Sequence, residues 1–96
     1  MPHTKAKLIH SFKLIDRVKG LMERKVWEVP QDEKNPDGIR YRLVYIPVGQ
    51  ESPAVLYDNH HPKGHHKHID GLEIAYDYSE FENLLKDFRQ DVEAFK

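Results

Sequence analysis

The chain has 96 residues, of which 39% are hydrophobic and 32% charged, and its formal net charge is −1 at pH 7. This length and composition predict one folded domain over residues 1–96 and argue against intrinsic disorder. The absence of cysteine excludes disulfides, thiolate metal sites and a cysteine nucleophile. No window approaches the ~20 apolar residues of a membrane span, so we expect a cytoplasmic protein with no membrane partner.

The charge is unevenly distributed along the chain. Residues 1–25 carry seven basic side chains against two acids, whereas residues 70–96 carry eight acids against three basic side chains. One end of the molecule could therefore face a polyanion, although two ordinary solvated surfaces would give the same pattern.

The first part of the chain is predicted to form strands. Beta-branched and aromatic content favours a strand from Lys7 to Ile15, and a turn at residues 18–20 leads into a second strand from Leu21 to Val29. Pro30 ends this strand because proline has no amide hydrogen to donate. A polar loop with a Pro-Asp-Gly turn signal occupies residues 31–38.

The clearest strand covers residues 39–48. Strict alternation places Arg40 and Arg42 on one face and Tyr41 and Tyr45 on the other. We expect the tyrosines to lie in the core, while the arginines stay available to pair with phosphate.

Two shorter strands and a helix complete the predicted fold. Strands are expected over residues 54–58 and, after an Asp70-Gly71 turn, over residues 73–78. Ser79 and Glu82 have the spacing of a capping box, and an amphipathic stripe follows at helical period: Phe81, Leu84, Leu85, Phe88, Val92 and Phe95. The prediction is an α+β fold, an antiparallel meander sheet of four to five strands with a C-terminal amphipathic helix packed on one face. Trp27 is expected in its core.

Five of the seven histidines fall within residues 58–68 (DNHHPKGHHKH). On an extended backbone His66 and His68 point the same way, which is the geometry of a chelating pair. His60 or His61, with Asp58, could complete a site for a divalent ion such as zinc or nickel.

A second interpretation uses the cations inside the cluster. Lys63 and Lys67 would repel a metal dication, but they suit RNA cleavage through the 2′-hydroxyl, which needs a base, an acid and positive charge. His66, His68 and Lys67 are then the catalytic candidates, and no metal is required. The substrate-binding candidates are Arg40, Arg42, Asn59 and Lys63. The third interpretation is a solvated loop, in which Asp58 and Asn59 merely hold a turn.

Several short runs resemble the TumE-like family, small prokaryotic toxins of toxin–antitoxin pairs. They are VWEVP at 26–30, YRLVYI at 41–46, YDN at 57–59, KG at 63–64, HKH at 66–68 and LLKDF at 84–88. The resemblance implies a toxin with RNA as the expected target, neutralised by a helix-turn-helix antitoxin encoded beside it. It carries over to Asp58, Asn59, Lys63, Gly64, His66, Lys67 and His68, whereas His65 departs from the family, where an acid often stands.

Together these observations predict a toxin acting as a metal-independent endoribonuclease. The alternative is a metal-binding or protein-interaction module, with the histidine loop as ligand cluster or docking surface and no catalysis.

Overall fold

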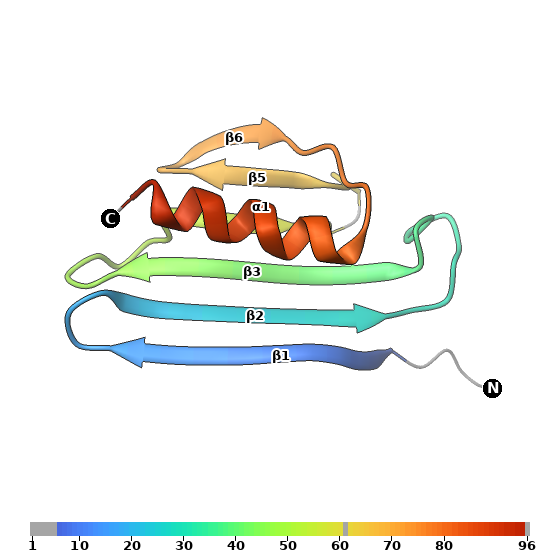
Figure 1. Ribbon diagram of the computed structural model, residues 1–96. Helices are drawn as coiled ribbons and strands as arrows, with labels where there is room; N and C mark the ends of the chain where they lie inside the picture. The colour runs from blue at the N-terminus through green and yellow to red at the C-terminus, as the bar shows by residue number, and fades with distance from the viewer. Residues whose placement is uncertain (1–5, 61, 96) are drawn as a thin grey trace.

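A computed structural model describes residues 6–60 and 62–95 of the chain. Within those ranges it has six strands and one helix (Figure 1), namely β1 (Lys7–Asp16), β2 (Gly20–Glu28), β3 (Ile39–Pro47), β4 (Val55–Asp58), β5 (His66–Ile69), β6 (Leu72–Ala75) and α1 (Phe81–Glu93). The helix has 13 residues and is too short to cross a membrane.

The strands form one antiparallel meander in which each strand pairs with the next along the chain. The α+β prediction with a C-terminal helix is confirmed, but the described sheet has six strands rather than four to five. The additional strand is β5, whose sequence HKHI is too polar to stand out. β6 spans Leu72–Ala75 instead of residues 73–78.

The turn between β1 and β2 depends on Gly20. Its φ is 117°, and a Cβ at this position would lie 2.2 Å from the carbonyl oxygen of Ile46 on β3. Asp16 shapes the same turn because its carboxylate accepts hydrogen bonds from the amides of Val18 and Lys19. Glycine therefore permits β3 to approach the tip of this hairpin.

The core lies between the sheet and α1. Tyr41 and Tyr45 are buried as predicted, and they share the helix-facing side of the sheet with Val26. Trp27 is half-buried on the other face and lies outside the core. That prediction was wrong because neighbouring residues of a strand alternate, and Val26 occupies the core position.

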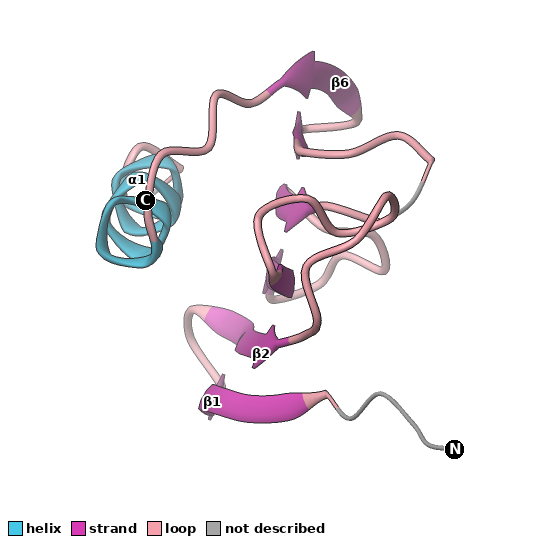
Figure 2. Cartoon of the chain, turned by 90° about the vertical axis from the view of Figure 1, so that its right-hand side faces the viewer, coloured by secondary structure: helices cyan, strands magenta, loops and turns pink. Residues whose placement is uncertain are grey.

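The helix begins one residue later than predicted. Its N-cap is Glu80, without a side-chain capping bond, so the capping box of Ser79 and Glu82 does not form. The Ser79 hydroxyl instead accepts a hydrogen bond from the Asn83 side chain. Seen along the strands, α1 covers the middle of the sheet and leaves β1 and β2 to one side (Figure 2).

Candidate functional site

The helix-free face of the sheet brings His66 and His68 together. His66 pairs across the sheet with Asp58, and His68 with Leu56. The two imidazole centroids are 5.2 Å apart, in an edge-to-face arrangement. The i, i+2 spacing thus orients both rings to one side, as the sequence predicted.

The surroundings of His66 define where its proton lies. Its Nδ1 is 2.8 Å from the carbonyl oxygen of Gly64, and a carbonyl can only accept, so Nδ1 carries the hydrogen. In the neutral ring Nε2 is then a free acceptor. With the residue 8% exposed, this arrangement is that of an oriented general base.

His68 faces an anion instead. Its Nε2 lies 3.6 Å from a carboxylate oxygen of Glu73, and the same oxygen accepts a hydrogen bond of 2.7 Å from Lys63. This bond from Lys63 is the main cause that lowers the pKa of Glu73, so the carboxylate is charged at neutral pH. An N–H at Nε2 of His68 therefore has an acceptor, which suits a proton donor.

The predicted phosphate-binding arginines lie on the same face. Arg42 pairs across the sheet with Asp58, which pairs with His66, so three strands contribute to one polar row. With strands about 4.8 Å apart, the Arg42 backbone is about 10 Å from that of His66, within reach of a guanidinium. Arg40 is exposed, and its Nη2 lies 3.4 Å from Nδ1 of His60.

A hollow of about 200 Å³ adjoins His68 on this face. Its remaining walls come from the β3–β4 loop, from β4 and from the β5–β6 turn: Ser52, Pro53, Leu56, Asp70 and Gly71. The histidine pair is therefore beside a concave surface rather than on a flat sheet.

Lys67, expected beside the histidines, lies on the opposite face. Its Nζ is 3.0 Å from the Asp91 carboxylate of α1, and the hydroxyl of Tyr57 donates to the same carboxylate. Burial, followed by the hydrogen bond to Asp91, raises the pKa of Tyr57. Lys67 thus ties the helix to the sheet.

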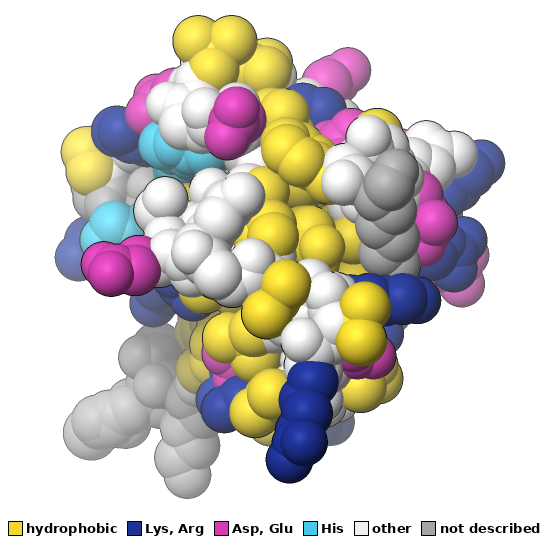
Figure 3. Space-filling model, turned by 90° about the vertical axis from the view of Figure 1, so that its left-hand side faces the viewer, with side chains coloured by type: hydrophobic (Ala, Val, Ile, Leu, Met, Phe, Trp, Pro, Cys, Tyr) yellow, Lys and Arg dark blue, Asp and Glu magenta, His cyan; other side chains and the backbone are white. Residues whose placement is uncertain are grey.

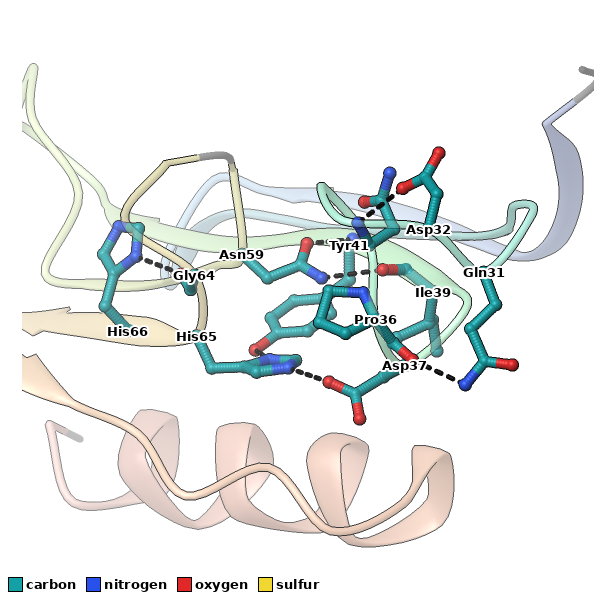
Figure 4. Close-up of polar contacts among 11 residues, drawn as sticks. Gln31, Asp32, Pro36, Asp37, Ile39, Tyr41, Asn59, Gly64, His65 and His66 are labelled. Atoms are coloured by element: carbon teal, nitrogen blue, oxygen red, sulfur yellow. Dashed lines mark hydrogen bonds and ion pairs between the residues drawn. The ribbon is translucent and has the colours of Figure 1, made fainter.

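Asn59, expected to bind substrate, is used by the backbone of β3 (Figure 4). Its carbonyl oxygen accepts from the amide of Tyr41 at 2.9 Å, and its amide nitrogen donates to the carbonyl of Ile39 at 2.7 Å. The residue is 6% exposed. The interpretation in which Asn59 holds local structure matches this geometry.

Sequence reasoning missed a second polar cluster, centred on His65 (Figure 4). Its Nε2 donates to the Asp37 carboxylate at 2.6 Å, and its Nδ1 accepts from the hydroxyl of Tyr41 at 2.8 Å. The ring stacks on Tyr78 with centroids 4.6 Å apart. Burial raises the pKa of Tyr41, so its hydroxyl remains a donor. This cluster fastens the 31–38 loop to the sheet; the Pro-Asp-Gly turn was visible in the sequence, but its partner was not.

The predicted metal ligands do not converge in the described part of the chain. His60 contacts Arg40, His61 lies outside the described residues, and His66 and His68 form a separate pair. No group of three or more histidine, aspartate or glutamate side chains within residues 6–60 and 62–95 is placed to hold a metal ion. A zinc or nickel site built on His60, His61, His66 and His68 stays a prediction.

The fold and the site define a small α+β domain with histidines and arginines on its helix-free sheet face. The family model described as Toxin TumE matches residues 5–96, and the chain belongs to this toxin family. No curated protein and no solved structure matches the chain. The predicted family and the toxin role are confirmed, and membership indicates an antitoxin partner.

Proposed function

We propose that this toxin is a metal-independent endoribonuclease, with His66 as general base and His68 as general acid. The observation that carries the proposal is the pair of adjacent imidazoles with different hydrogen-bond partners. Gly64 leaves Nε2 of His66 free to accept a proton, while Glu73 favours a proton on Nε2 of His68.

The chemistry follows from these proton positions. Nε2 of His66 removes the proton of the ribose 2′-hydroxyl, and the oxygen attacks the adjacent phosphorus. His68 protonates the departing 5′-oxygen, so the products are a 2′,3′-cyclic phosphate and a 5′-hydroxyl. Lys63 and Arg42 supply positive charge to the phosphorane, and Lys63 exchanges its contact with Glu73 for the phosphate.

Two sequence-predicted residues have no direct part in this reaction. Lys67 is held on the helix-facing side by Asp91, and the Asn59 side chain is occupied by two backbone groups. Arg40, exposed beside His60, extends the cationic face along β3 and would contact a neighbouring phosphate. The proposal also includes a helix-turn-helix antitoxin and a cytosolic site of action, where RNA is available.

The test is RNA cleavage by untagged protein with EDTA present. The proposal expects cleavage to survive EDTA and to stop when the scissile nucleotide is a 2′-deoxynucleotide. His66→Ala and His68→Ala should each slow cleavage by ~10² or more, the usual effect of losing a general acid or base. His10→Gln, on the helix-facing side of β1, is the matched histidine control and should cleave at the parent rate.

Three outcomes would contradict the proposal. Cleavage of the deoxy substrate would rule out the 2′-hydroxyl as nucleophile. Full activity of both histidine variants would remove the pair from the mechanism. Activity lost in EDTA, together with stoichiometric metal in elemental analysis, would favour the metal-binding alternative instead.

A further inference from the structure

Strand β1 forms an edge of the sheet, and its outer side has no partner in the described part of the chain. It is ten residues long and exposes large apolar side chains on both faces. The exposed fractions are Leu8 51%, Ile9 45%, Phe12 37%, Leu14 46% and Ile15 74%. A long apolar edge with unpaired backbone groups is a template for another strand and an aggregation hazard when left bare.

The helix does not protect this edge. It lies over the middle of the sheet, and the β1–β2 hairpin projects beyond it (Figure 2). Figure 3 shows the end of the molecule at which β1 turns into β2, where hydrophobic side chains reach the surface beside Lys and Arg. Val18 and Val48, at the turns of this end, are 79% and 57% exposed.

Two arginines give this surface an uncompensated positive charge. Arg24 of β2 pairs across the sheet with Phe12, and its guanidinium carbon lies 4.3 Å from the centre of that ring. Burial, and then the nearby charge of Arg89 on α1, lower the pKa of Arg24. Nε of Arg24 is buried without a hydrogen-bond partner, and no carboxylate of a described residue forms an ion pair with either arginine.

We propose that the antitoxin docks here by adding a strand to β1. The segment it inserts is extended, with apolar residues alternating with Asp or Glu, so that apolar side chains cover the exposed strand and a carboxylate meets the arginines. We call this the β1 docking surface: Leu8, Ile9, Phe12, Leu14, Ile15, Arg24 and Arg89. The inference rests on the toxin–antitoxin pairing, but it is independent of the cleavage chemistry.

Charge decides between this partner and two others. The described β1–β2 hairpin carries six basic side chains against Asp16 and Glu23, so a second copy of the chain would bring like charges together at the edge. RNA would satisfy the cations but could not cover apolar side chains on both faces of a strand or continue its backbone ladder. An acidic, apolar polypeptide satisfies all three requirements.

The experiment measures binding of the protein encoded by the reading frame adjacent to the toxin gene. Isothermal titration is compared for the full-length toxin, for Arg24→Glu and for the control Lys86→Glu, an exposed cation of α1. Arg24→Glu should weaken binding by about 30-fold or more, the scale for losing one partner of a buried charge pair. Lys86→Glu should change it by less than about threefold.

Hydrogen exchange and cleavage complete the test. Amides of β1 should exchange at least about tenfold more slowly in the complex, because strand addition gives them acceptors. RNA cleavage by Arg24→Glu at the parent rate would show that the variant is folded. It would also separate failure of docking from failure of the nuclease. Arg24→Gln, which only removes the charge, should bind with intermediate affinity.

Several results would overturn the inference. Equal affinity of Arg24→Glu and the parent, or protection outside β1, would place the partner elsewhere. A dimer of the toxin alone that Arg24→Glu dissociates would identify a second copy as the occupant, and equal loss of RNA affinity would identify a nucleic-acid surface. An adjacent gene product that does not bind would refute the docking and the antitoxin expectation together.

Discussion

Asn59 provides a sharp test of the site assignment, because the structure gives its side chain a role in folding. Both polar atoms of the buried amide bond to β3, at 2.9 Å to the Tyr41 amide and 2.7 Å to the Ile39 carbonyl. Asn59→Ala would leave both backbone groups buried without partners. At about 1–3 kcal/mol for each, the free energy of unfolding should fall by about 2–5 kcal/mol.

Urea unfolding followed by circular dichroism measures this loss, with His60→Ala as the exposed neighbouring control. For a domain of this size the predicted loss lowers the melting temperature by roughly 10 °C or more. Asn59→Asp should also destabilise, because a carboxylate cannot donate to Ile39. A change below about 0.5 kcal/mol in Asn59→Ala, combined with weaker RNA binding, would refute this reasoning and restore Asn59 as a substrate contact.

Three further predictions concern the fold and the cationic face. Gly20→Ala should lower the free energy of unfolding by about 3 kcal/mol in urea titrations, because its Cβ would lie 2.2 Å from the Ile46 carbonyl oxygen; a stable variant would show that the hairpin can move aside. The pKa of Tyr57 is raised above its ordinary value of 10.0 by burial, so its stabilising contribution is present below pH 10 and is lost as the pH rises further. Unfolding measured from about pH 8 to about pH 11 should show that loss, and Tyr57→Phe should show a smaller one. Arg42→Ala should weaken single-stranded RNA binding and reduce the salt slope by about 0.7, whereas an unchanged slope would exclude a phosphate contact.

The sequence predicted the elements whose pattern is local. β3 alternates between exposed arginines and buried tyrosines along its length, and α1 repeats apolar residues at helical period, so both were recognised. β5 was missed because HKHI contains three polar residues in four and becomes a strand only by pairing with β4 and β6. Its stability comes from tertiary context, which local propensity does not contain.

The site was predictable to the same extent. The spacing of His66 and His68 predicted their common face, but their hydrogen-bond partners depend on a turn carbonyl and on a residue of the next strand. The same alternation places Lys67 on the other face, where Asp91, 24 residues later, meets it. His65, treated as a departure from the family, finds Asp37 and Tyr41 only after the 31–38 loop folds back.

The roles assigned to the two histidines are tested most directly with an RNA whose departing 5′-oxygen is replaced by sulfur. A thiolate leaves without protonation, so this substrate should restore most of the cleavage lost in His68→Ala and none of that lost in His66→Ala. Rescue of His66→Ala instead would reverse the assignment. Equal, unrescued losses in both variants would contradict acid–base catalysis by this pair.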